Sequence, residues 1–226
     1  MLALVKAFDF AAIANAIAAS PELLSFRDER GRNWLHLCCA TKPRSPRQVH
    51  DSVRTAQVLL ESGLDINREA FTEDDWKATP LWFAIARGEN LALAEFLLKC
   101  GSNPNYCLWA ASFRNDLDAI RLLVRYGADV NDACLDESPL LGAVKWSKFS
   151  AAADLLRLGA NPDYRDSKGM TALHYMLKKD SDKRHFAMFV AHGARADIKN
   201  GDGVTAADLM RRKRDRDFHR IADRLR

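Results

Sequence analysis

The stretch ATPLWFAIARGENLALAEFLLKCGSNPN, residues 78–105, contains two apolar segments of helical length separated by Gly88. It opens with Thr-Pro-Leu, which is typical of a helix start, because proline at the first helical position loses no hydrogen bond that the helix needs. It closes with Gly-Ser-Asn-Pro-Asn, which is typical of a turn. The stretch therefore predicts a helical hairpin, and a search for further copies decides whether it stands alone.

The closing turn recurs along the chain, as SGLDIN from Ser62, CGSNPN from Cys100, YGADVN from Tyr126, LGANPD from Leu158 and HGARAD from His192. The glycines of these five turns are separated by 38, 26, 32 and 34 residues. The opening segment recurs too, in NWLHLCCA, TPLWFAIA, SPLLGAV and TALHYML. A repeat of this length is typical of a solenoid, in which neighbouring hairpins bury each other's apolar faces.

These motifs resemble the ankyrin repeat, a unit of about 33 residues with a T-P-L-H-x-A start. The resemblance implies an all-α solenoid of stacked helical hairpins with short β-hairpin fingers, and about five repeats plus capping units. We expect a single domain over residues 1–226. Residues 1–31 are predicted to form N-terminal capping helices, residues 32–200 the repeats, and residues 201–226 a C-terminal capping repeat.

Within each unit we expect the threonine or serine before proline to cap the first helix, as at Thr79. Leu81, Phe83 and Ala84 should then face the core. The second helix should end where glycine adopts the left-handed conformation, as at Gly127. His36 and His174 occupy a repeat position that ordinarily forms hydrogen bonds at the helix start, so neither is a persuasive catalytic base.

Composition restricts the class of protein. Hydrophobic residues make up 48% and charged residues 28% of the 226 residues, which is typical of a folded soluble chain. No apolar run approaches the length of a membrane span. The apolar N-terminus is interrupted by Lys6 and Asp9, which favours an amphipathic helix over a signal peptide. We therefore expect a cytoplasmic monomer, with export as an effector left open.

The five cysteines are odd in number and lack the spacing of a disulfide framework or of a zinc site. Cys38 and Cys39 occupy positions where ankyrin repeats usually have alanine, so we predict that they pack in the core. We expect no disulfide, no metal and no cofactor. The chain has no H-E-x-x-H, G-x-S-x-G or glycine-rich phosphate motif, and we predict that it is not an enzyme.

Three irregularities interrupt the repeat. Residues 40–54 contain extra residues that predict an exposed loop between two helices. The connection after Asn67 is long and predicts a protruding finger. Its aromatic residues, Phe71 and Trp76, are candidate partner anchors, although Trp76 equally fits a role in covering its neighbour. The next finger is nearly absent between Asn105 and Leu108.

The resemblance implies that partners bind the concave side, at the ends of the first helices. In each unit these are the two residues just before the break between the two helices, which is Gly88 in the first stretch. Together they include several basic residues, two aromatic residues and no acid. They are Ala86 and Arg87, Phe113 and Arg114, Lys145 and Trp146, and Lys178 and Lys179. We predict a non-catalytic protein–protein interaction module that binds an acidic protein surface or peptide.

Several alternatives remain open for these basic residues. They form a solubilising face, or the chain is a spacer with no binding face. A further alternative is binding to nucleic acid or an acidic surface. Either the basic face or the C-terminal segment, residues 209–226, could provide it, since that segment has eight Arg or Lys against three Asp. The net charge of +4 does not decide among them.

Overall fold

The computed structural model describes residues 1–73 and 76–224, and these residues form an all-α protein with one short hairpin. The helices are α1 (Leu2–Ala7), α2 (Phe10–Ala19), η1 (Pro21–Ser25, a 3₁₀ helix), α3 (Trp34–Ala40), α4 (Pro46–Glu61), α5 (Pro80–Ala86), α6 (Leu91–Lys99), α7 (Cys107–Arg114), α8 (Leu117–Arg125), α9 (Pro139–Lys145), α10 (Phe149–Arg157), α11 (Ala172–Lys178), α12 (Lys183–Ala191), α13 (Ala206–Arg212) and α14 (Arg216–Arg224). Strands β1 (Ala70–Phe71) and β2 (Lys77–Ala78) complete the described structure. The predicted all-α class and helical hairpins are confirmed.

The chain divides into two compact units, Met1–Ala110 and Ala111–Arg226, called unit 1 and unit 2 below. In unit 1 the first helices α3 and α5 pack together, and the second helices α4 and α6 do the same. Leu35, Leu59 and Phe83 are fully buried at these contacts. Cys38 and Cys39 are also buried, as predicted, and burial raises the pKa of both thiols.

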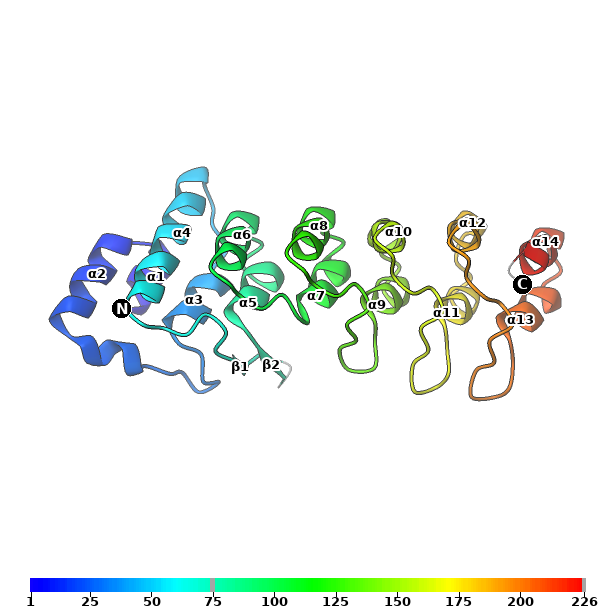
Figure 1. Ribbon diagram of the computed structural model, residues 1–226, viewed down its shortest axis with the longest axis horizontal. Helices are drawn as coiled ribbons and strands as arrows, with labels where there is room; N and C mark the ends of the chain where they lie inside the picture. Colours follow the sequence, from blue (N-terminus) through cyan, green and yellow to red (C-terminus); the bar gives the residue numbers. More distant parts are fainter. Residues whose placement is uncertain (74–75, 225–226) are drawn as a thin grey trace. The chain divides into compact units, whose positions relative to one another are not determined.

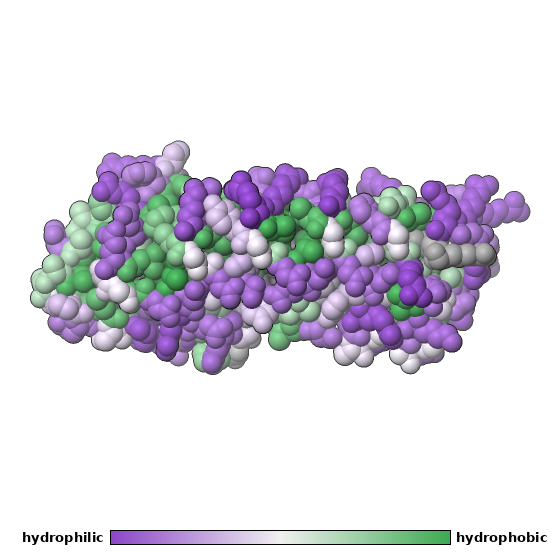
Figure 2. All heavy atoms as spheres, in the orientation of Figure 1, coloured by the Kyte–Doolittle hydropathy of each residue, from purple (hydrophilic) through white to green (hydrophobic). Residues whose placement is uncertain are grey.

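Unit 1 begins with α1 and α2, which pack against each other; α1 also contacts α3, and α2 contacts α4. Val5, Phe8 and Ile13 are buried on the inner side. Hydrophobic residues also gather on the outer surface of this end of unit 1, where α1 and α2 lie (Figure 2). This pair of helices therefore covers the first hairpin, but it does so with an outer surface that is less polar than a terminal unit usually has.

Unit 2 arranges its helices in two rows (Figure 1). The first helices α9, α11 and α13 form one row, and α8, α10, α12 and α14 form the other. Within each row α9 packs against α11, α11 against α13, and α12 against α14. Long connections project on the side of the first helices and serve as the fingers of this unit (Figure 1). They contain isolated bridges, Cys134 to Glu137 and Lys199 to Thr205.

Two local predictions were wrong. Of residues 40–54 only 41–45 form a loop between the two helices, since α4 begins at Pro46 and runs for 16 residues, and Ser45 caps it by accepting a hydrogen bond from Gln48 N–H. Proline at the first position starts this helix instead of breaking it. Thr79, in turn, does not cap α5 with its side chain, whereas Ser138 does cap α9. The start of α5 depends on Pro80 and the Thr79 carbonyl.

The predicted finger after Asn67 is present as the antiparallel pair β1–β2, with Ala70 opposite Ala78 and Phe71 opposite Lys77. The predicted loss of the next finger is also seen, because α7 begins at Cys107, directly after Tyr106 with a left-handed φ of 63°. In the described residues no helix is both long and apolar enough to cross a membrane.

Candidate functional site

Unit 2 contains a groove of about 970 Å³ between its first helices and its fingers. Three first helices and two fingers supply its walls: Lys145 from α9, His174, Tyr175, Leu177 and Lys178 from α11, Leu209 and Arg212 from α13 with Lys213 after it, and Lys168, Met170, Asn200, Gly201 and Asp202 from the fingers. Five of these side chains are cationic and one, Asp202, is acidic. The groove therefore favours an anionic ligand.

The five cations differ in their partners. Lys145 forms an ion pair with Glu137, and Lys213 forms one with Asp180. Within the described part of the chain, the other three have no carboxylate oxygen within 4.0 Å: Lys168, Lys178 and Arg212. All three residues are exposed. Their charge is thus available to a ligand in the groove.

The wall of the groove at α9 is rigidly built. The Lys145 ammonium lies 5.0 Å from the centre of the Tyr175 ring, in addition to its pair with Glu137. The Tyr175 hydroxyl donates a 2.5 Å hydrogen bond to Asp166, and burial together with that carboxylate raises the pKa of Tyr175. Asp166 also accepts hydrogen bonds from the backbone N–H groups of Lys168 and Met170. The finger is therefore fixed to the helix that it faces.

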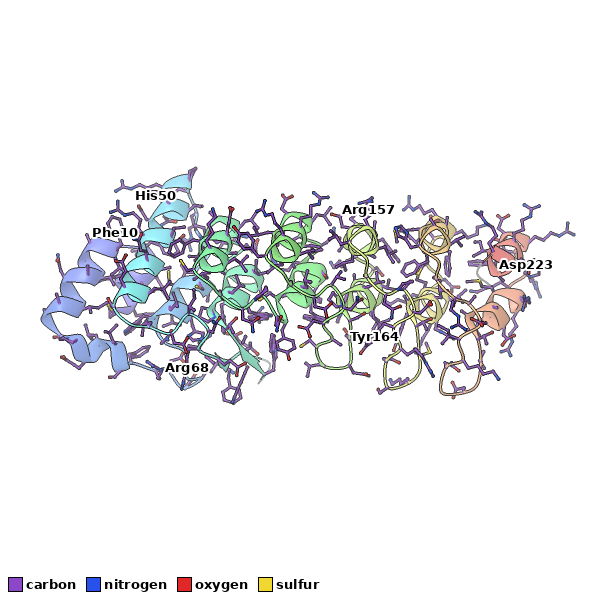
Figure 3. The ribbon with its side chains drawn as sticks, viewed as in Figure 1. Phe10, His50, Arg68, Arg157, Tyr164 and Asp223 are labelled. Atoms are coloured by element: carbon purple, nitrogen blue, oxygen red, sulfur yellow. The ribbon has the colours of Figure 1, made fainter. Side chains whose placement is uncertain are left out.

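His174 fixes the start of α11, whose residues line the groove. Its Nδ1 accepts from Thr171 N–H at 3.2 Å, and its Nε2 lies 3.1 Å from the Val204 carbonyl of the next finger. His36 has the same arrangement in unit 1, with Nδ1 facing Asn33 N–H and Nε2 2.8 Å from the Arg68 carbonyl. Arg68 lies at the start of the finger (Figure 3). Both histidines thus connect a helix start to a finger.

Beside the groove, two predicted aromatic residues are brought together. Phe113, near the end of α7, and Trp146, directly after α9, have ring centres 5.1 Å apart and meet edge to face. Their exposed fractions are 38% and 54%, which is high for rings of this size. Arg114 is partly buried next to them. We refer to Phe113 and Trp146 as the aromatic pair.

The other predicted residues have different roles. The Lys179 ammonium donates to the Lys145 carbonyl. In unit 1, Arg87 pairs with Glu73 of the finger at 3.2 Å and lies over the Trp82 ring. The predicted positions contain no acid, but the fingers place Glu73 and Glu137 beside them, so the face is less basic than its sequence indicates.

The two aromatic residues of the unit 1 finger differ. Phe71 is 44% exposed, with the Lys77 ammonium 5.6 Å from its ring centre. Trp76 is partly buried and meets Trp82 edge to face at 4.6 Å. Of the two interpretations that the sequence left open for Trp76, covering its neighbour fits this geometry, and Phe71 alone extends to solvent.

Three of the five groove cations were not among the predicted partner contacts: Lys168, Arg212 and Lys213. Lys168 belongs to a finger, whose path the sequence does not show. Arg212 and Lys213 were assigned with the rest of residues 209–226 to a single basic terminal segment. The structure divides that segment, because α13 ends at Arg212 in the row of first helices and α14 lies in the row of second helices (Figure 1). The segment TAADLM from Thr205, which resembles the repeat starts at Thr79 and Thr171, was the available signal.

Stacked helical hairpins whose second helices end in left-handed glycine define a helical repeat protein. The family model described as ankyrin repeats (3 copies) matches residues 81–166. The human protein "Ankyrin repeat and SOCS box protein 6" is 34% identical over 129 residues, which cover 49% of this chain and 31% of that protein. The chain thus spans about a third of the length of this relative.

Two solved ankyrin repeat domains have the same fold. The domain of Bcl-3, described as a member of the IkappaB protein family, superposes with a TM-score of 0.76 at 20% identity and covers 99% of this chain and 96% of that one. The domain of human ASB11 gives 0.72 at 21% identity, with coverage of 92% and 90%. The described residues thus have the fold of an ankyrin repeat domain, and the ankyrin family model matches residues 81–166 of them. Ankyrin repeat domains are generally protein–protein interaction modules and are typically non-catalytic.

Proposed function

We propose that unit 2 binds an acidic segment of another protein in the groove between its first helices and fingers. The observation that carries this proposal is the convergence of Lys168, Lys178 and Arg212 on one groove without carboxylate partners in the described part of the chain. Uncompensated charge of one sign steers an oppositely charged partner and fixes its register. The rigid finger walls support the proposal, because a preformed groove loses little entropy on binding.

A protein segment fits this groove better than a nucleic acid does. A nucleic acid presents a regular series of phosphates, and the groove edge holds Glu137, Asp166 and Asp202 among its cations. Acidic residues of a peptide can be spaced to avoid those carboxylates, whereas phosphates at every nucleotide cannot. Binding of nucleic acid or an acidic surface through α14 is the competing function that the experiment below distinguishes.

Phe71 supplies a second proposed contact, on the finger of unit 1. It is the exposed aromatic of that finger, while Trp76 is packed against Trp82 and contributes support. An exposed aromatic on a protruding hairpin fits an interface anchor. This contact is independent of the groove and does not depend on its charge.

The test uses matched charge reversals. One variant carries Lys178→Glu and Arg212→Glu in the groove, and the control carries Arg216→Glu and Arg220→Glu on α14, which changes the net charge equally. The probes are a fluorescein-labelled octapeptide of glutamate and an oligonucleotide of eight thymidines, measured by anisotropy. We expect the groove variant to bind the peptide at least about tenfold more weakly, and the control to bind it within twofold of wild type.

Two results would contradict the proposal. If the control loses peptide binding and the groove variant does not, the contact lies on α14. If wild type binds the oligonucleotide more tightly than the peptide and the groove variant loses both, the groove serves nucleic acid.

A further inference from the structure

The aromatic pair lies beside the groove at the end of α9. Phe113 and Trp146 are 38% and 54% exposed, which is a large exposed fraction for aromatic side chains. Trp146 directly follows Lys145, and Lys145 lines the groove. A segment lying in the groove at α9 therefore reaches the aromatic pair with its next residues.

Lys145 itself offers little to such a segment. Its ammonium is paired with Glu137 and lies over the Tyr175 ring. Lys178 and Arg212, which have no carboxylate partner among residues 1–73 and 76–224, lie further along, on α11 and at the end of α13. Two chemically different surfaces thus follow each other along the row of first helices. The surface at α7 and α9 is apolar, and the surface at α11 and α13 is cationic.

Their separation can be estimated from helix packing. The helices α9, α11 and α13 are successive neighbours, and packed helices lie about 8–10 Å apart. The aromatic pair and the Lys178–Arg212 surface are therefore about two helix spacings, or roughly 16–20 Å, apart. An extended chain rises about 3.3 Å per residue, so this distance corresponds to about five or six residues.

We propose that the ligand segment is bipartite, with a bulky apolar side chain on the aromatic pair and two or more carboxylates about five or six residues away on Lys178 and Arg212. This inference rests on the proposed function of the groove. An apolar side chain of a protein fits the edge-to-face pair, since the two rings form an angled apolar surface. The carboxylates determine which segments associate, and the apolar anchor determines how long they stay bound.

The test compares four labelled peptides by anisotropy. The first has leucine, five Gly/Ser residues and three glutamates; the second has the reverse order; the third has glycine in place of leucine; the fourth has leucine with a one-residue spacer. We expect one of the two orders to bind wild type about tenfold more tightly than the glycine peptide, as for burial of one leucine. The one-residue spacer should lose most of that advantage.

Two variants assign the effect to its surface. Trp146→Ala should remove the advantage of leucine and leave binding of the glycine peptide within twofold of wild type. Lys178→Glu with Arg212→Glu should weaken all four peptides. If the leucine and glycine peptides bind wild type equally in both orders, the anchor is wrong and the acidic groove stands. If none of the peptides binds wild type, the groove is wrong, and the bipartite ligand with it.

Discussion

Gly88 lies where the connection after α5 passes the backbone of α3 in unit 1. A Cβ atom at this position would lie 2.2 Å from the Cys39 carbonyl oxygen and 3.2 Å from that of Ala84. The residue that reverses the chain here is Glu89, with a left-handed φ of 47°. Gly88 is therefore required because two hairpins approach closely, and not because its own backbone needs a left-handed conformation.

We predict that Gly88→Ala lowers the free energy of unfolding by about 2–3 kcal/mol, as overpacking against fixed backbone does. Gly63→Ala is the matched control, since Gly63 has a φ of 96° but nothing within 4 Å of an added Cβ. The control should cost about 1 kcal/mol of backbone strain. Urea denaturation followed by circular dichroism measures both, and a larger loss for Gly63→Ala would contradict the close approach.

His36 is the residue whose titration should be visible in stability. It is fully buried, and its Nε2 lies 2.8 Å from the Arg68 carbonyl. Burial lowers the pKa of His36 from 6.5 to about 4, because the protonated ring loses its hydration. The unfolded chain therefore binds a proton between pH 6.5 and about 4 that the folded chain does not, so stability falls as the pH falls through this window.

We expect His36 to contribute about 3 kcal/mol to the loss of unfolding free energy between pH 6.5 and 4, at 1.36 kcal/mol per pKa unit. The measurement is urea denaturation of wild type and His36→Gln at both pH values. His36→Gln should be less stable at pH 6.5, because it loses the capping contact, and should lose less on acidification. His174, whose pKa burial also lowers, is unchanged in both chains. Parallel losses in the two chains would exclude His36 as the source.

At the scale of the element, α14 covers the end of unit 2. Phe218 on α14 meets Phe186 on α12 edge to face at 5.3 Å, and Phe186 and Phe189 are fully buried. Lys183 at the start of α12 pairs with Asp215 and Asp217, each at 2.7 Å. The helix combines an apolar contact on its inner side with charge on its outer side, as a terminal unit needs.

We predict that Phe218→Ala lowers the free energy of unfolding by about 2 kcal/mol, somewhat less than for a fully buried phenylalanine. Arg220→Ala is the control, since its side chain is 81% exposed and a change there should cost less than about 0.5 kcal/mol. Differential scanning calorimetry measures both. Equal melting temperatures for Phe218→Ala and wild type would show that α14 does not hold the end of the unit.

At the scale of the whole molecule, the distribution of charge matters more than its sum. The net charge is +4, yet unit 2 places five cations around one groove and pairs two of them with acids. The pairing acids are Glu137 of a finger and Asp180 of the turn between α11 and α12, and Lys168, Lys178 and Arg212 remain for a ligand. Their effect on association should depend on the screening length of the solution.

We predict that raising NaCl from about 50 mM to about 500 mM slows association of an acidic peptide at least tenfold and changes its dissociation less than threefold. Stopped-flow anisotropy with the leucine–glutamate peptide measures both rates. Trp146→Ala should instead accelerate dissociation at both salt concentrations, because an apolar contact is not screened. A salt effect confined to dissociation would contradict charge steering.

The sequence by itself determined the repeat and therefore the class of fold. Two of its signals are local: the glycine at the end of each second helix, and Thr-Pro or Ser-Pro at the start of a first helix. Each signal depends only on the backbone conformation that glycine or proline favours at that position. The burial of Leu81, Phe83, Cys38 and Cys39 followed from the repeat, because each position faces the same kind of neighbour in every copy. The finger after Asn67 and the lack of the next finger followed from the number of residues that connect one hairpin to the next.

Only the tertiary structure decided the groove and the state of its charges. Lys145 and Lys178 were predicted from their repeat position on the first helices. Lys168 joins them from the finger before α11, and Arg212 joins them from α13 in the capping unit. Glu137 neutralises Lys145 from eight residues away, and Trp146 meets Phe113 from the neighbouring hairpin. Conformation at a glycine or proline is a property of one residue. The charge and exposure of a groove depend on which residues distant in sequence lie together, and stacking of the hairpins determines that.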